Sequence, residues 1–321
     1  MSETRYYKVA GHCFGVTAEA EVFELMGNYE PFEECTIHNA QFKMHNAQDF
    51  AFSLIVGNGR GQEYTEELRQ EDEEQDIICG HTADGRAVFE FLHSVGSERP
   101  KVECCRNGET AGWLVCSNGY REGRLVMTGS YRKLAIDNAL MVLFALATAD
   151  KGTALFHAAV VSHKGKAYMF LGPSGTGKST HARLWLRASP QPLAIGGEPT
   201  TGAELVNDDN PVVRVGGDGS TVVYGTPWSG KTPCYRNVSY PLGGIVLLSQ
   251  APHNKIRRLS GIEAYAALVP SISGKRWDAQ IADGLHQTEN ALATNVPVWH
   301  LECLPDEEAA RLCATQISNE Q

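Results

Sequence analysis

The most constraining feature of this chain is the stretch from Tyr168 to Thr180, where an apolar run leads into Gly-Pro-Ser-Gly-Thr-Gly-Lys-Ser-Thr. The stretch has the Gly-x-x-x-x-Gly-Lys-Ser spacing of a P-loop, and a helix-forming run from His181 to Arg187 follows it. Glycines let the backbone curl so that successive N–H groups point at one anion, and the helix adds its positive N-terminal end. The stretch therefore predicts a strand, a phosphate-binding loop and a helix. A glycine turn without a ligand is the alternative.

The residues of this loop have different expected roles. Lys178 is expected to reach the β- and γ-phosphates of ATP, and the Ser179 hydroxyl is expected to hold Mg²⁺. The other positions expected to bind the nucleotide are Gly172, Ser174, Gly175, Thr176, Gly177 and Thr180. ATP and Mg²⁺ are therefore the predicted ligands.

Composition limits the partners and the compartment. The 321 residues suggest two domains, and a net charge of −10 argues against nucleic acid as a partner. The chain has no apolar run of membrane-spanning length and begins with a polar segment, so we expect no membrane segment and a cytoplasmic location. None of the nine cysteines lies in a Cys-x-x-Cys motif, which favours reduced thiols.

Residues 1–130 are predicted to form a β-rich recognition domain. Short runs rich in aromatic and β-branched residues alternate with Asn-Gly and Asp-Gly turn signals. The runs are 6–16, 50–56, 87–92, 102–105, 111–116 and 123–128. Residues 63–76 carry eight acids and predict a solvated loop, with a partner-binding loop as the alternative. No catalytic spacing occurs here, so the expected role is recognition of a substrate or partner.

The second predicted domain, 131–321, is α/β. An amphipathic helix over 131–150 opens it, and runs 155–161 and 167–171 predict a hairpin that leads into the P-loop. Further runs predict strands at 204–207, 211–215, 221–224, 242–249 and 296–301, and helices at 261–269, 277–293 and 307–317.

The run Glu204–Asn207 ends in Asp208 and Asp209, at the strand end where ligands bind in α/β sheets. Phosphoryl transfer needs positioned phosphates, a metal and a carboxylate beside the acceptor hydroxyl. One aspartate could therefore orient Mg²⁺ while the other accepts the substrate proton. The alternative is that one of them caps a turn.

The loop after Tyr224 supplies the candidates for substrate binding. Ser229, Lys231 and Arg236 could contact substrate phosphate, although both cations could also be solvated surface residues. His157 lies in an otherwise apolar run, which by itself indicates a core histidine.

At these residues the chain resembles the HPr kinase/phosphorylase family, whose fold is similar to phosphoenolpyruvate carboxykinase. Three features match in order over about residues 155–248: Phe156-His157-Ala158, the loop from Gly172 to Ser179, and Leu205-Val206-Asn207-Asp208-Asp209. The resemblance implies a P-loop kinase domain with a mixed sheet behind the β-rich domain. It also implies that Asp208 is the acid/base carboxylate, that Asp209 is a metal partner with Ser179, and that His157 and Lys178 belong to the active site.

The expected function is therefore an ATP- and Mg²⁺-dependent kinase acting on a hydroxyl, with serine of a protein or peptide as the leading acceptor and a small molecule as another. Two alternatives stay open: a nucleotide-dependent switch with slow hydrolysis, and a carboxykinase-like enzyme. The sequence also leaves a homo-oligomer open.

Overall fold

A computed structural model describes residues 1–34, 50–71, 75–94, 108–188 and 202–319. The fold is mixed α/β and divides into two compact units, 1–147 and 148–321. This division differs from the sequence-based boundary at 130/131, because helix α2 (Arg132–Thr148) packs on the first sheet. The ring of Phe144 meets those of Phe14 and Phe52 edge-on, with centroids 6.5 Å apart in both pairs.

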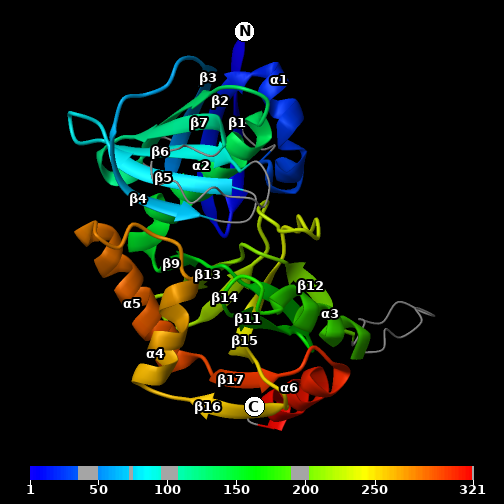
Figure 1. The fold of residues 1–321 in the computed structure, drawn as a ribbon. Coiled ribbons are helices and arrows are strands. Elements are labelled where there is room, and N and C mark those ends of the chain that lie inside the picture. The colour runs from blue at the N-terminus through cyan, green and yellow to red at the C-terminus, as the bar shows by residue number, and fades with distance from the viewer. Residues whose placement is uncertain (35–49, 72–74, 95–107, 189–201, 320–321) are drawn as a thin grey trace. The chain divides into compact units, whose positions relative to one another are not determined.

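The first unit contains an eight-stranded sheet in the order β1-β2-β3-β8-β7-β6-β5-β4 (Figure 1). Its strands are β1 (Ser2–Val9), β2 (His12–Glu19), β3 (Phe52–Asn58), β4 (Thr65–Glu71), β5 (Gln75–His81), β6 (Ala87–His93), β7 (Glu109–Cys116) and β8 (Glu122–Met127). The short helices are α1 (Ala20–Phe23), η1 (Glu24–Phe32) and η4 (Asn118–Tyr120).

Two sequence predictions for this unit were wrong. The run 6–16 is not one strand, because Ala10 and Gly11 take φ values of 48° and 77° and turn the chain between β1 and β2. The acidic segment 63–76 is not a loop throughout: residues 65–71 form β4, and residues 75 and 76 begin β5. The acidic side chains of β4 face solvent while its backbone pairs with β5, as suits a strand at the sheet edge. The predicted strand 102–105 lies outside the described residues.

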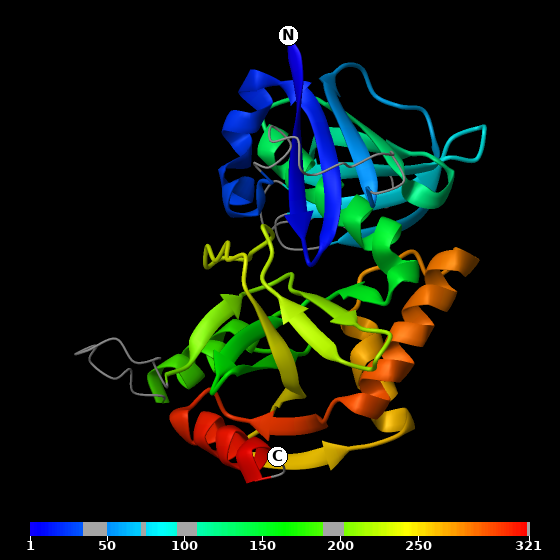
Figure 2. The ribbon, with the colours of Figure 1, turned by 180° about the vertical axis from the view of Figure 1, so that it is seen from behind.

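The second unit is built on a nine-stranded sheet in which β12, β10, β11, β15, β14, β13 and β9 are neighbours in that order, and β17 pairs with β15 and β16 (Figure 2). Its strands are β9 (Thr153–Leu155), β10 (Ala159–His163), β11 (Lys166–Leu171), β12 (Glu204–Asn207), β13 (Val212–Val215), β14 (Thr221–Tyr224), β15 (Ser239–Gln250), β16 (Lys255–Leu259) and β17 (Val298–Cys303). The helices are η5 (Ala149–Lys151), α3 (Lys178–Ala188), α4 (Ile262–Leu268), η6 (Val269–Ser271), α5 (Ala279–Asn295) and α6 (Glu307–Asn319).

Most predicted elements of the second unit are confirmed, with one informative exception. The run 155–161 is not a single strand: β9 pairs with β13, whereas β10 pairs with β11 and β12. The residues between β9 and β10 include His157, whose N–H donates to the Ser271 carbonyl at 2.7 Å. The neighbouring Phe156 forms an isolated antiparallel bridge with Ile272, so this segment pairs with residues 271–273 instead of continuing β9 into β10. In the described ranges, no helix combines the length and apolar composition needed to cross a membrane.

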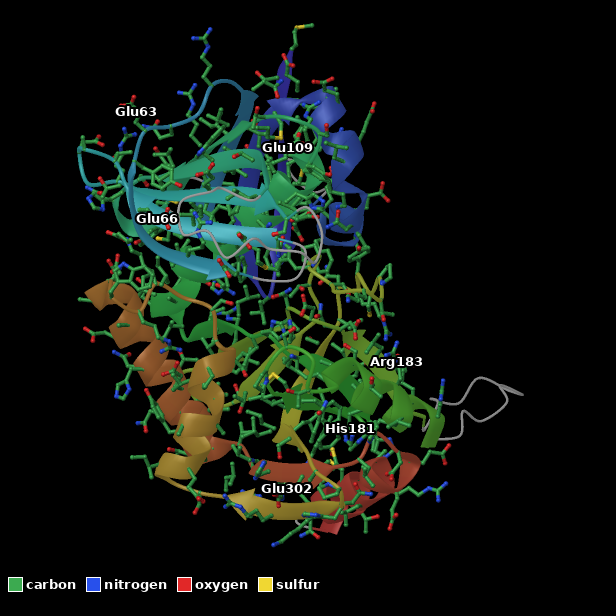
Figure 3. The ribbon with its side chains drawn as sticks, in the orientation of Figure 1. Glu63, Glu66, Glu109, His181, Arg183 and Glu302 are labelled. Atoms are coloured by element: carbon green, nitrogen blue, oxygen red, sulfur yellow. The ribbon has the colours of Figure 1, made fainter. Side chains whose placement is uncertain are left out.

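Helix α3 follows the predicted P-loop and packs with α6 on one face of the sheet. Its buried face contributes Ala182, Leu184 and Trp185 to a core that also contains Phe170 and Trp299. His181 lies on the same helix as the exposed Arg183 (Figure 3) but is only 3% exposed. The Trp185 indole N–H donates to His181 Nε2 at 3.2 Å, so the neutral imidazole fits this core.

Burial of His181 predicts a loss of stability in mild acid. Burial lowers the pKa of His181 from 6.5 to about 4. Between these two pH values the unfolded chain takes up a proton at His181 but the folded protein does not, so the stability present above pH 6.5 is lost as the pH falls toward 4. The loss should reach about 3 kcal/mol. We expect the free energy of unfolding, measured by denaturant titration from pH 7 to pH 4.5, to fall more steeply for the wild type than for His181→Gln. Parallel pH profiles would contradict this expectation.

Candidate active site

The order of the strands brings three predicted site segments to one edge of the second sheet. Strand β10 is antiparallel to both β11 and β12, so its first residue lies beside the last residues of its two neighbours. The Ala158 N–H extends this pairing by donating to the Asp209 carbonyl at 2.8 Å. Because neighbouring strands are about 4.8 Å apart, the ends of β11 and β12 are about 10 Å apart.

The loop after β11 curls as the glycine spacing predicts. Gly172, Gly175 and Gly177 take φ values of 147°, 77° and 105°, which side-chain-bearing residues rarely adopt. The Thr176 hydroxyl closes the turn by donating to the Pro173 carbonyl at 2.7 Å, while Ser174 is exposed. Helix α3 begins at Lys178, directly after Gly177, so the N-terminus of the helix faces the loop.

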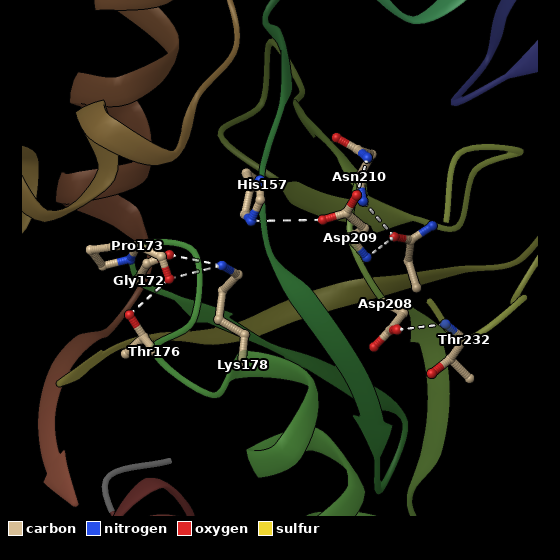
Figure 4. Close-up of polar contacts among 10 residues, drawn as sticks. His157, Gly172, Pro173, Thr176, Lys178, Asp208, Asp209, Asn210 and Thr232 are labelled. Carbon is tan, nitrogen blue, oxygen red and sulfur yellow. Dashed lines mark hydrogen bonds and ion pairs between the residues drawn. The ribbon is translucent and has the colours of Figure 1, made fainter. Parts of the chain in front are cut away.

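Lys178 is buried against this loop. Its ammonium group donates to the Gly172 carbonyl at 2.9 Å and to the Pro173 carbonyl at 3.3 Å (Figure 4). Ser179 and Thr180 follow in the first turn of α3 and are partly exposed, and the Thr180 hydroxyl accepts a hydrogen bond from Arg183. The cation is therefore positioned inside the curl of the loop.

The two predicted carboxylates have different surroundings. Asp209 Oδ1 lies 3.7 Å from His157 Nε2, and its Oδ2 accepts a hydrogen bond of 2.7 Å from the Asn210 side chain. Asp208 is 5% exposed, and its Oδ2 accepts a hydrogen bond of 3.1 Å from the Thr232 N–H (Figure 4). The His157 side chain is 42% exposed, so it is not the core histidine that the residue pattern alone indicated.

Asn207 was not among the predicted site residues. Its side chain fixes the turn formed by Asp208, Asp209 and Asn210, which we call the carboxylate turn. Its Oδ1 accepts hydrogen bonds from the N–H groups of Asp209 at 2.9 Å and Asn210 at 2.8 Å. Its Nδ2 donates to the Thr226 hydroxyl and the Trp228 carbonyl, both at 3.0 Å. This fully buried amide therefore joins the end of β12 to the loop that follows β14. The sequence shows the asparagine directly before two aspartates, but it does not show the partners of the Asn207 side chain, because they lie about 20 residues further along the chain.

Replacing Asn207 by alanine should destabilise the protein and should also disorder the carboxylate turn. The substitution leaves two backbone N–H groups, a hydroxyl and a carbonyl with fewer partners in a buried place, so we expect a loss of about 2 to 4 kcal/mol in the free energy of unfolding. Denaturant titration measures this loss.

The matched control for this prediction is Asn290→Ala, which removes an exposed asparagine from α5. That change should alter the unfolding free energy by less than about 0.5 kcal/mol. Equal stabilities of the two variants would show that the Asn207 amide does not hold the turn.

The loop after β14 passes close to both aspartates. A Cβ atom added at Gly230 would lie 3.1 Å from Asp209 Cβ and 3.7 Å from Asp208 Oδ2. Of the predicted substrate contacts, Ser229 donates its hydroxyl hydrogen to the Thr232 carbonyl at 2.7 Å, and Lys231 is exposed. The loop thus brings one hydroxyl and one cation near the carboxylate turn.

Arg236 is engaged differently from the other two predicted substrate contacts. Its guanidinium donates to the Leu205 carbonyl and to the Glu204 carboxylate, both at 2.7 Å. The nearby Cys234 thiol faces the carbonyls of β12, and burial raises its pKa. Arg236 therefore fixes the far end of the loop to β12. The guanidinium N–H groups that make these bonds are the ones that would bind a phosphate.

Comparisons with known proteins add little at the level of sequence. No family model matches the chain, and no curated protein matches it. Among solved structures, the Hpr(Ser) kinase/phosphatase from Coxiella burnetii matches 52% of this chain and 95% of its own, at 11% sequence identity and a TM-score of 0.29. A TM-score this low does not establish a shared fold.

Proposed function

We propose that the second unit is an ATP- and Mg²⁺-dependent kinase that transfers the γ-phosphate of ATP to a hydroxyl group. A serine of a protein or peptide is the leading acceptor class, and a small-molecule alcohol is the other. The observation that carries the proposal is the common sheet edge shared by the glycine-rich loop, His157 and the two aspartates. A loop that only turned the chain would not need a buried lysine on one side and carboxylates on the other.

The residues present fit both ligands. A Cβ atom at Gly175 or Gly177 would meet nothing within 4 Å, so the loop backbone is open on that side to an anion. The donor set for a metal is a serine hydroxyl with carboxylates, which are the hard oxygen ligands that Mg²⁺ prefers. We assign Ser179 and Asp209 to the metal, which when bound would neutralise phosphate charge.

The protein groups then divide the work of transfer. The loop N–H groups, the α3 N-terminus and Lys178 bind the phosphates and offset the negative charge of the transition state. Asp208 accepts the proton of the attacking hydroxyl, while the Thr232 N–H fixes the orientation of its carboxylate. The Asn210 side chain fixes one oxygen of Asp209 by a hydrogen bond, and His157 Nε2 lies 3.7 Å from the other. We assign contact with the acceptor to Ser229 and Lys231, and we propose separately that the first unit recognises a substrate or partner.

Labelled ATP tests the proposal directly. The full chain is incubated with γ-labelled ATP and Mg²⁺, with and without a dialysed cell extract, and label is followed in protein, in small molecules and as free phosphate. Label on an acceptor that depends on the protein supports the kinase. Free phosphate alone would reject phosphotransfer, and oxaloacetate-dependent consumption of ATP would indicate a carboxykinase.

A second candidate, a nucleotide-dependent switch with slow hydrolysis, is favoured by the burial of Asp208. A carboxylate that is 5% exposed and bonded to a backbone N–H is less open to an incoming alcohol than a solvent-facing one. In that case the same assay gives slow phosphate release, with no labelled acceptor at any extract concentration.

A further inference from the structure

The sheet continues past the glycine-rich loop on the side away from the aspartates. Strand β15 pairs parallel with β11, and β17 pairs parallel with β15, so the carboxyl ends of all three strands lie at one edge. The last residue of β15 contacts the loop: the Gln250 side-chain amide donates to the Gly175 carbonyl at 3.2 Å. The loop therefore has neighbours on both sides.

A polar pair lies on these two strands. Ser249 Oγ and His300 Nε2 are 2.9 Å apart, and both residues are partly buried. The register pairs Leu247 with His300 and Ser249 with Glu302, so the pair shares one face of the sheet with Glu302, which Figure 3 labels. The opposite face carries the apolar residues that pack against α3 and α6.

The loops that leave these strands are tied to each other. The Asn254 side chain donates to Asp306 at 3.1 Å and accepts from the Leu304 N–H at 2.9 Å. The Ala251 N–H donates to the Cys303 carbonyl at 3.1 Å. These bonds fix the backbone around the edge beside Ser249 and His300, as a binding site built on strand ends requires.

A nucleophilic role fits the Ser249–His300 pair less well than binding. Such a serine needs a base that a third group orients, usually a carboxylate. The Arg257 guanidinium, and after it His300, lower the pKa of Glu263. Both oxygens of Glu263 bind Arg257, at 3.0 and 3.2 Å, so this carboxylate already has its partner.

We infer that Ser249 and His300 form the subsite for the sugar and base of the nucleotide whose phosphates lie in the glycine-rich loop. This inference rests on the proposed function. The subsite begins one to two strands from β11, about 5 to 10 Å, which a sugar and base attached to loop-bound phosphates can cover. A hydroxyl and an imidazole are suitable partners for sugar hydroxyls and base edges. The acceptor then enters from the opposite side, over β10 and β12.

Comparing ATP with inorganic tripolyphosphate tests the subsite, because the second ligand has phosphates but no sugar or base. Dissociation constants of both ligands, with Mg²⁺, are measured by calorimetry for the full chain, His300→Ala and Ser249→Ala. Loss of one or two hydrogen bonds should weaken ATP binding about tenfold. Tripolyphosphate binding should change less than about twofold. His286→Ala, an exposed histidine on α5, should leave both ligands unchanged.

Each outcome decides the inference. If the His300 variant is unstable, Ser249→Ala carries the test, because it removes only a hydroxyl group. Equal weakening of ATP and tripolyphosphate would show that these residues shape the phosphate loop, and no change in either would also overturn the subsite. Both results leave the proposed kinase intact. If the wild type binds neither ligand, the proposed function itself fails and the subsite fails with it.

Discussion

Replacing Asp208 by asparagine is expected to lower the turnover number by about 10²- to 10⁴-fold while the dissociation constant of ATP stays within about twofold. Asparagine has the same shape and keeps an oxygen for the Thr232 N–H, which bonds to Asp208 at 3.1 Å. It cannot accept a proton from an alcohol. Because the substituted atom lies about two strands from the phosphate loop, nucleotide binding should survive. Single-turnover transfer from labelled ATP, with calorimetry of binding, measures both quantities.

The matched control for this experiment is Asp218→Asn, which changes an exposed aspartate in the turn between β13 and β14. It should leave turnover unchanged. If Asp208→Asn keeps full turnover, the base has been assigned to the wrong group, and Asp209→Asn becomes the variant to examine. If Asp208→Asn loses ATP binding, the carboxylate holds the metal or the loop rather than the substrate proton.

Replacing Lys178 by methionine is expected to weaken ATP binding about 10- to 100-fold and to remove measurable transfer. Methionine fills a similar volume but lacks the ammonium group, which lies within 2.9 and 3.3 Å of two loop carbonyls. The variant thus removes a buried charge and its phosphate contacts without opening a large cavity. Calorimetry with ATP and with tripolyphosphate should show the same loss of affinity, because Lys178 is expected to contact the phosphates of the nucleotide and not its sugar or base.

Lys164→Met is the control, because this exposed lysine lies in the turn between β10 and β11 of the same unit. It should bind both ligands as the wild type does. Unchanged ATP binding in Lys178→Met would mean that the loop is a structural turn, and the proposed kinase would have no phosphate site. A large drop in unfolding free energy would instead assign Lys178 mainly to holding the loop closed.

Local patterns predicted much of the second unit, because its signals lie in short contiguous runs. The strand and helix around the glycine-rich loop, the strand that ends at Asn207, and the hairpin between 212 and 224 all appear in the structure. Each depends on hydrophobic periodicity and on turn residues a few positions apart.

The features that the sequence did not reveal depend on contacts between distant segments. The role of Asn207 requires Thr226 and Trp228 to lie beside β12, and the position of Arg236 requires Glu204. The boundary was predicted at 130/131, whereas the compact units divide at 147/148, because the sequence does not show which sheet the apolar face of helix α2 packs against. Strand β4 was not predicted, because its charged side chains do not show a strand pattern. It is a strand because its backbone pairs with β5.

Strand β15 belongs to both halves of the second sheet. Its first residues pair antiparallel with β14, and the rest pair parallel with β11 and β17. The partner changes between Pro241 and Leu242, and Gly244 lies just beyond this point, where a Cβ atom would be 2.4 Å from the Trp299 ring. Neither half can therefore detach without releasing the same strand. In hydrogen–deuterium exchange, the β15 amides on the two sides of Leu242 should lose protection together, as one cooperative opening unit, rather than as two independent ones.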